Sequence, residues 1–160
     1  MHGAHCNERA EKAARECRWA DMSVRPSKVV EQFVDRINAH DVEGLLRLIT
    51  DDHLFVDSLG CAIRGRKAIH RGWISYFEWM PDYSIHVEHK FARGDVVGLF
   101  GRASGTYAIG DELREENHWE IPAAWRAAVR DGLVAEWQVF ADNKPVYEIM
   151  SRGAKSGVSG

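Results

Sequence analysis

The sequence predicts an α+β fold in which helices precede a strongly curved, mostly antiparallel sheet. Apolar residues recur at helical spacing as far as about residue 80, and the pattern then changes to the alternation typical of strands. One long predicted strand contains Gly98, Gly101 and Gly105, and glycine within a strand often marks a bulge or a bend. Three N-terminal helices are therefore expected to cover the concave face of the sheet.

The overall composition fits one globular domain. The chain has 160 residues and a formal net charge of -3, so it is long enough to bury a core and lacks the basic excess of nucleic-acid-binding surfaces. No apolar run reaches the roughly 20 residues that span a bilayer, and no secretory signal is apparent, so a cytoplasmic location is expected. Three unevenly spaced cysteines imply no disulfide framework.

The helical half follows a polar N-terminal extension, residues 1–22, which is expected to be helix-prone. The first main helix is predicted from Pro26 to Ala39, since proline is tolerated in the first turn. Asp41 is a good N-cap for a second helix, which is expected to continue through Ile49. A third helix is predicted from Gly65 to Trp79. The main domain is expected to span residues 23–152, with a flexible tail at residues 153–160.

The strand half begins with a short apolar strand between the second and third helices, and this strand carries an acid. After the third helix, glycine-containing turns divide the chain into segments with strand periodicity. These predicted strands are Ile85–Lys90, Val96–Ile109, Glu112–Val129 and Leu133–Ala141.

Asp57 is the strongest candidate functional residue. It stands in the apolar run Leu54–Leu59, where a charged carboxylate is costly, so this acid is expected to be protonated, paired or functional. A carboxylate in an apolar pocket can act as a general base that removes a proton from carbon next to a carbonyl. The alternative is a structural role in which Asp57 caps the following turn. The sequence leaves both interpretations open.

His118 and Glu120 are two positions apart on a predicted strand, so their side chains share one face. If that face lines a pocket, either residue is a candidate proton donor; otherwise both lie on the solvated rim. Trp119 and Trp125 would then occupy the opposite face and need a cover such as a partner subunit. Other aromatic residues are candidates for the pocket wall, although plain core packing is the alternative: Trp73, Phe77, Tyr107 and Trp137.

A series of short motifs occurs in order along the chain. They are Asp51-Asp52 before Phe55-Val56-Asp57, Gly65-Arg66-Lys67-Ala68-Ile69, Pro81-Asp82-Tyr83, Gly94-Asp95-Val96-Val97 and Asp131-Gly132-Leu133-Val134-Ala135-Glu136-Trp137. In this order they resemble the SnoaL-like group of the nuclear transport factor 2-like superfamily, which includes the ketosteroid isomerases. The resemblance covers about Pro26 to Arg152 and implies a cone-shaped fold with a deep apolar pocket. It also implies a homodimer formed through the outer face of the sheet.

The resemblance also bears on the chemistry of the pocket. Ketosteroid isomerases use a carboxylate base with a tyrosine and a protonated aspartate as oxyanion donors. By similarity Asp57 falls on the base, while Phe33 takes the tyrosine position and the second aspartate falls near Ala124. Phe33 therefore joins the candidate ligand-binding residues, and both oxyanion donors are missing. The epoxide hydrolases of this fold use an Asp–Arg–Asp set, of which Arg102 matches the arginine only.

Together these observations favour a small cofactor-independent enzyme that transfers protons on a hydrophobic carbonyl compound, as an isomerase, cyclase or dehydratase. Asp57 would be the base and His118 or Glu120 the acid. One alternative is a noncatalytic module that binds a small hydrophobic molecule or a protein partner. Another is a structural dimeric domain with a collapsed pocket. No metal, nucleic-acid or membrane partner is expected.

Overall fold

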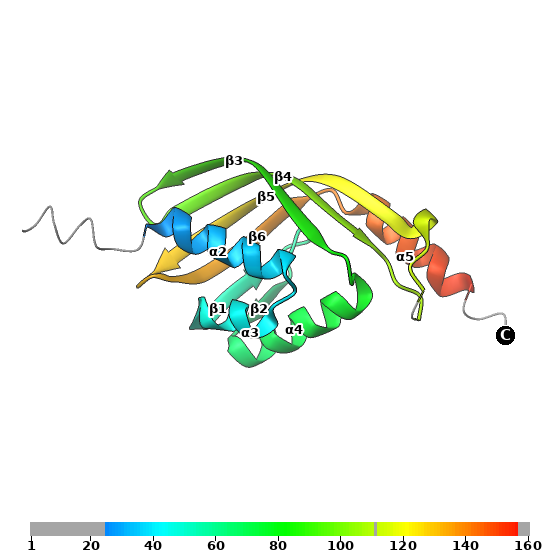
Figure 1. Ribbon diagram of the computed structural model, residues 1–160, viewed down its shortest axis with the longest axis horizontal. Coiled ribbons are helices and arrows are strands. Elements are labelled where there is room, and N and C mark those ends of the chain that lie inside the picture. Colours follow the sequence, from blue (N-terminus) through cyan, green and yellow to red (C-terminus); the bar gives the residue numbers. More distant parts are fainter. Residues whose placement is uncertain (1–24, 111, 157–160) are drawn as a thin grey trace, which may run out of the picture.

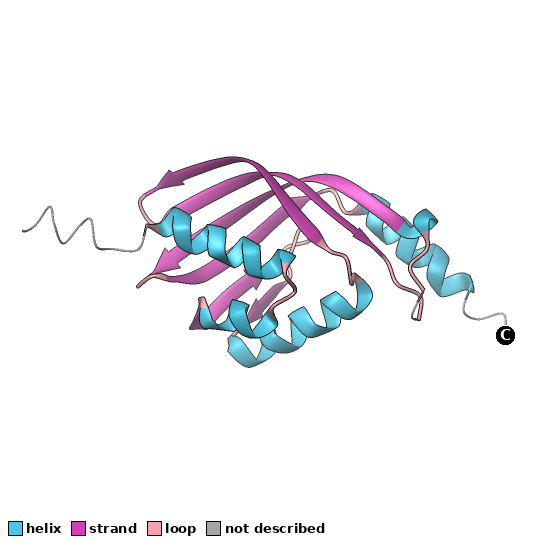
Figure 2. Ribbon diagram, viewed as in Figure 1, coloured by secondary structure: helices cyan, strands magenta, loops and turns pink. Residues whose placement is uncertain are grey.

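The computed structural model describes residues 25–110 and 112–156 and contains the predicted helices and strands in the predicted order, with two further elements described below. A six-stranded sheet curves over three helices that lie on its concave side (Figure 1). Figure 2 shows the same division into a helical layer and a strand layer. The α+β class is therefore confirmed. The predicted extension at residues 1–22 lies outside the described residues.

The helices on the concave side are α2 (Pro26–Asn38), α3 (Val42–Arg47) and α4 (Arg66–Trp79). Helix α2 packs one apolar stripe against the sheet, with every member of the stripe buried. Helix α3 begins at the predicted N-cap, because the Gly44 N–H donates to Asp41 Oδ1 at 2.8 Å. This hydrogen bond lowers the pKa of Asp41, and the neighbouring arginine side chains act in the same direction.

The sheet has the strand order β2-β1-β6-β5-β4-β3. Strands β1 and β6 run parallel, and the other neighbouring pairs are antiparallel. Among the described residues the first strand thus pairs with the last, and the long connection between them carries the rest of the sheet. The strands are β1 (Ile49–Val56), β2 (Ala62–Arg64), β3 (Ser84–Arg93), β4 (Val96–Thr106), β5 (His118–Arg130) and β6 (Leu133–Ala141).

Several predicted boundaries differ from the structure. Helix α3 ends at Arg47, and Ile49 already belongs to β1 because it pairs with Val134 of β6. Strand β4 ends at Thr106. Strand β5 begins at His118 rather than Glu112, since the acidic segment before it forms a loop and a single 3-10 turn instead of pairing with β4.

Two elements were not predicted from the sequence, the short strand β2 and the helix α5 (Lys144–Ser156). Helix α5 lies at one end of the sheet, apart from the other helices (Figure 1), and it buries Val146 and Ile149. Its start carries a recognisable signal, because the Lys144 N–H donates to Asp142 Oδ1 at 3.0 Å and a proline follows. The helix continues into the segment that was expected to be a flexible tail.

A bulge in β3 bends the sheet beside Gly101. The register between β3 and β4 shifts between Val87 and His89, as predicted for a glycine within a strand. At Gly101 a Cβ atom would lie 1.9 Å from the carbonyl oxygen of His86. Only glycine lets the two backbones approach this closely.

Helix α2 is also fastened to the edge of the sheet. The side chain of Asn38 both donates to the Ile85 carbonyl, at 2.9 Å, and accepts from the Ile85 N–H, at 2.8 Å. His40 Nε2 lies 2.9 Å from the Tyr83 carbonyl oxygen and donates to it. The amide of Asn38 thus takes the place of a neighbouring strand on the free edge of β3. Among the described residues, no helix is both long and apolar enough to cross a membrane.

One histidine is fully enclosed between α2 and the sheet. His53 has no exposed surface, and its Nδ1 donates to the Val134 carbonyl oxygen at 2.8 Å. Its Nε2 has no hydrogen-bond partner within the described part of the chain. Burial lowers the pKa of His53, because the charged imidazolium would lose its hydration.

We expect this histidine to make the fold sensitive to mild acid. The unfolded chain takes up a proton near pH 6.5, whereas folded His53 takes it up only at lower pH. The free energy of unfolding should therefore be unaffected by His53 above pH 6.5 and fall below it, by up to about 1.4 kcal/mol per pH unit. Urea unfolding between pH 5 and pH 8 measures this slope.

Two variants assign the slope to one residue. His53→Asn keeps an N–H that can donate to Val134 and should flatten the dependence between pH 5 and 6.5, whatever its absolute stability. His89→Gln replaces an exposed histidine and should leave the slope as it is. A His53→Asn protein with the wild-type slope would contradict this explanation.

Candidate functional site

A cavity of about 360 Å³ lies between the inner face of the sheet, helix α4 and helix α5. Its wall is formed mainly by aromatic and aliphatic side chains. Strands β1, β4, β5 and β6 supply one side and α4 the other, while α5 lies across one end. The lining residues are Phe55, Asp57, Ser58, Ile63, Ile69, Gly72, Trp73, Tyr76, Trp79, Met80, Tyr83, Ala103, Trp119, Ile121, Ala123, Trp137, Val139, Ala141, Asn143, Val146, Tyr147 and Met150.

Two of the predicted wall residues, Trp73 and Trp137, line this cavity. Trp73 lies on the inner face of α4, and its ring centroid is 6.2 Å from that of Phe55 in an edge-to-face arrangement. Trp137 lies on β6 and is 1% exposed. Phe77 stacks on Trp73 and Phe33 packs against Trp137, so neighbouring rings hold both indoles in place at the cavity wall.

The other three predicted wall residues do not line the cavity. Phe33 is fully buried behind the wall, with its ring centroid 5.0 Å from that of Trp137. Phe77 stacks on His40 at a centroid distance of 4.3 Å, on the side of Trp73 away from the cavity lining. Tyr107 follows the end of β4. The aromatic pattern identified core residues correctly but did not separate the innermost layer from the layer behind it.

Two tyrosines in the wall were missed by the sequence analysis. Tyr76 and Tyr83 line the cavity with their ring centroids 4.9 Å apart. Burial raises the pKa of both phenols, and the nearby phenol of Tyr147 adds to the effect on Tyr76. Both hydroxyls therefore stay protonated and able to donate hydrogen bonds. A signal was present, since Tyr76 lies one helical turn after Trp73 on the same face of α4.

Asp57 lines the cavity at the end of β1 and is half-buried. Its Oδ1 accepts hydrogen bonds from the N–H groups of Leu59, at 2.9 Å, and Cys61, at 2.8 Å. The turn is closed further by the Asp57 N–H, which donates to the Cys61 carbonyl at 3.0 Å. Asp57 therefore does cap the following turn, and the same geometry fixes the direction of its carboxylate at the cavity wall.

The only charged side chain among the described residues of the cavity wall is negative. Among the described residues that line it, Asp57 is the sole carboxylate, and no lysine, arginine or histidine is present. An anionic ligand would therefore find no cation to pair with. Within the described part of the chain, no group of three or more metal-ligating side chains is placed to hold an ion.

His118 and Glu120 lie on the outer face of β5, so the expectation that they line the pocket is wrong. Both are exposed. Glu120 forms an ion pair with Arg102 on the neighbouring strand. His118 Nδ1 lies 3.1 Å from Thr106 Oγ1, which itself donates to Asp82 Oδ2 at 2.7 Å. These contacts tie the outer ends of the strands together.

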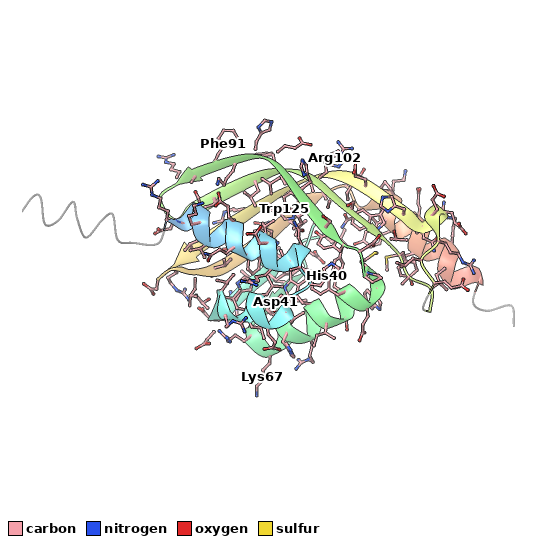
Figure 3. The ribbon with its side chains drawn as sticks, in the orientation of Figure 1. His40, Asp41, Lys67, Phe91, Arg102 and Trp125 are labelled. Carbon is pink, nitrogen blue, oxygen red and sulfur yellow. The ribbon has the colours of Figure 1, made fainter. Side chains whose placement is uncertain are left out.

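Trp119 and Trp125 lie on the inner face, where 6% and 1% of their surfaces are exposed. Trp119 lines the cavity and donates its indole N–H to the sulfur of Met80, at 3.4 Å. Figure 3 shows Trp125 between the sheet and the helices. The predicted exposure of these residues was wrong because the alternation along β5 has the opposite phase. A one-residue change of phase exchanges the two faces of a strand.

A curved sheet that closes over three helices around an apolar cavity defines the cone-shaped class of α+β domains. The sequence pattern of the SnoaL-like domain matches residues 30–137. The chain belongs to the SnoaL-like family. A comparison of the sequence with curated proteins gives no significant match.

Solved structures with the same fold include proteins from several bacteria. A proposed polyketide cyclase from Xanthomonas campestris is 17% identical with a TM-score of 0.70, and the match covers 78% of this chain and 96% of that protein. IdmH, a proposed polyketide cyclase from Streptomyces antibioticus, is 22% identical with a TM-score of 0.66, with 80% and 99% covered. A ketosteroid isomerase-like protein from Catenulispora acidiphila, solved with trimethylamine, is 16% identical with a TM-score of 0.62, with 71% and 84% covered. At these identities the likeness establishes the fold.

Proposed function

We propose that this SnoaL-like domain binds a small, flat, largely apolar carbonyl compound in its cavity and transfers a proton at the carbon next to the carbonyl. The observation that carries the proposal is the aromatic cavity of about 360 Å³ with one carboxylate and two buried phenols in its wall. Its size falls within the roughly 300–1,000 Å³ of small-molecule pockets. The structural neighbours proposed to be polyketide cyclases support chemistry of this kind.

In this proposal Asp57 is the base. Its Oδ1 is held by two backbone N–H groups, which leaves Oδ2 for the substrate. The C–H bond next to the carbonyl breaks, its proton moves to Asp57, and the electron pair moves onto the carbonyl oxygen. The phenols of Tyr76 and Tyr83 are candidate donors to that oxygen. If a C=C bond is conjugated with the enolate, return of the proton from Asp57 to the far carbon gives an isomer. If the enolate carbon instead attacks a second carbonyl of the same molecule, a ring forms, and the proton on Asp57 passes to the oxygen of that carbonyl.

Binding without chemistry is the second candidate function. It is favoured by the turn around Asp57, which gives the carboxylate a complete structural role. The Catenulispora protein, which has the same fold, was solved in complex with a small molecule, trimethylamine. The two candidates share the cavity and differ only in whether Asp57 moves a proton.

Because the cavity wall has a carboxylate and no cation, binding can be tested with a neutral and an anionic ligand of similar shape. We expect 2-acetylnaphthalene, an uncharged ketone, to quench the fluorescence of the cavity tryptophans. The anion 2-naphthoate has a similar shape but should bind at least about tenfold more weakly, because its charge would be desolvated without a cation beside it.

The same titration in Asp57→Asn is the control. Loss of the one carboxylate in the wall should reduce the difference in affinity between 2-acetylnaphthalene and 2-naphthoate. Equal binding of both probes to the wild-type protein would contradict the assignment of the cavity as the site. Absence of binding by either would remove the proposed function altogether.

We also propose that the outer face of the sheet contacts a second copy of the chain. Phe91, Phe100 and Phe140 are exposed there, at 66%, 50% and 49%, and paired strand positions place the last two in one row across β4, β5 and β6. Figure 3 shows Phe91 on the side of the sheet away from the helices. The row is bordered by the ion pairs Arg102–Glu120 and Arg126–Glu136. A patch with both charges around an apolar centre can be complementary to itself across a twofold axis.

We expect the wild-type protein to sediment as a dimer and Phe100→Glu to sediment as a monomer. The substitution places a charge at the centre of the apolar row, where two copies would bring like charges together. Leu113→Glu is the matched control, because Leu113 is exposed to a similar extent, 53%, outside this face. A monomeric wild type at high micromolar concentration, or a dimeric Phe100→Glu protein, would contradict the proposal.

A further inference from the structure

A second hollow lies directly outside the cavity. It is a groove of about 680 Å³ between the turn after β1, the end of β6 and the outward side of α5. Four residues line both the groove and the cavity. The two hollows therefore lie on either side of one thin partition. The shared residues are Ser58, Ala141, Asn143 and Tyr147.

A side-chain hydrogen bond links the two sides of the partition. Asn143 Nδ2 donates to Ser58 Oγ at 2.7 Å, which joins the start of α5 to the turn after β1. Tyr147 stands beside this bond and is 42% exposed, so its ring is not locked into the core. Ser58 directly follows Asp57. The partition between the two hollows is thus next to the proposed base.

The groove differs from the cavity in its chemistry. Its wall contains hydroxyl and amide groups and charges of both signs, with Lys144 Nζ 4.0 Å from Glu148 Oε1. Leu59, which is 67% exposed, adds an apolar surface at the other side. Because acids and bases are mixed, the groove favours no net charge on its occupant. It suits a flexible, uncharged chain with hydrogen-bonding groups.

We propose that the cavity and the groove form one site for an elongated molecule. Its flat apolar head lies in the cavity, and its uncharged polar chain passes between Ser58 and Asn143 into the groove. This inference rests on the proposed function, since the head is the carbonyl compound proposed above. On binding, Ser58 and Asn143 exchange their mutual hydrogen bond for hydrogen bonds to the ligand's polar chain, which opens the partition.

Calorimetric titration with two probes tests the proposal. The first probe is 2-acetylnaphthalene, and the second is the same ketone with a short oligo(ethylene glycol) chain at position 6. The chain should tighten binding to the wild-type protein at least about tenfold, the ratio expected for one or two well-formed hydrogen bonds. Ser151 lines the groove but not the cavity. Ser151→Trp should therefore abolish the gain in affinity that the chain provides, and Ser151→Ala should keep that gain.

The outcomes distinguish failure of the elongated site from failure of the proposed function. The probe without a chain should bind the wild type and both variants equally, which also shows that they are folded. If this probe binds but the chain gives no gain, or if the gain survives in Ser151→Trp, the elongated site is excluded and the proposed function stands. If neither probe binds, the proposed function fails and the elongated site fails with it.

Discussion

Replacing Asp57 with asparagine should reduce proton exchange on a bound ketone by about 10²–10⁴-fold, the usual contribution of a positioned general base. The reaction is followed by NMR as deuterium uptake from D₂O into the methyl group of 2-acetylnaphthalene. Asparagine keeps an oxygen that can accept the N–H groups of Leu59 and Cys61, so the turn should survive. The amide cannot take up the proton. Binding of the ketone should change little.

Two controls define what this result means. Asp51→Asn removes an exposed carboxylate from β1, the strand that precedes Asp57, and should leave the exchange rate unchanged. Titration of the ketone into Asp57→Asn distinguishes lost chemistry from lost binding. Unchanged exchange in Asp57→Asn, or no exchange above background in the wild type, would favour the binding function, in which Asp57 serves the turn alone.

Substitution of Gly101 by alanine should lower the free energy of unfolding by about 3 kcal/mol, at the upper end for overpacking of a core. The added methyl group would lie 1.9 Å from the His86 carbonyl oxygen. That oxygen belongs to the backbone of β3 at its bulge and cannot turn aside as a side chain can. The melting temperature should fall by roughly 6–12 °C. Calorimetry or urea unfolding measures the change.

Gly72→Ala is the matched control for this prediction. Gly72 lies within α4, and a Cβ atom there would meet nothing within 4 Å. Alanine should therefore raise the free energy of unfolding by about 0.5–1 kcal/mol, because it removes the entropic cost of glycine in a helix. The free energy of unfolding is therefore expected to fall in Gly101→Ala and to rise in Gly72→Ala. A Gly101→Ala protein as stable as the wild type would mean that β3 can move away without loss of packing.

Local signals in the sequence were sufficient for the helical layer and for most of the sheet. The apolar stripe of α2, the cap at Asp41 and the glycine at the bulge each act through neighbouring residues, so each could be recognised without the structure. The boundaries of β1 and β5 were harder to predict from the sequence. They depend on whether a partner strand is present, and one of the two partners of β1 is β6, the last of the described strands.

The candidate site was predicted in part for the same reason. Asp57, Trp73 and Trp137 were found because an acid in an apolar run and large aromatic rings are visible in the sequence. His118 was misplaced because alternation along β5 gives two faces but does not say which one is inside. Tyr83 was missed because it follows α4 in a turn, where no periodicity marks the direction of a side chain.

The parallel pairing of β1 with β6 also has a consequence for how the chain reaches its native state. His53 and Val134, which are joined by a hydrogen bond, stand 81 positions apart, and Ser58 and Asn143 stand 85 apart. Contacts this distant in sequence raise the contact order, which slows folding. During synthesis, α2, α3 and α4 emerge before the strand that completes the wall behind them. The hollow that would receive a ligand is therefore completed only after β6 and α5 have left the ribosome.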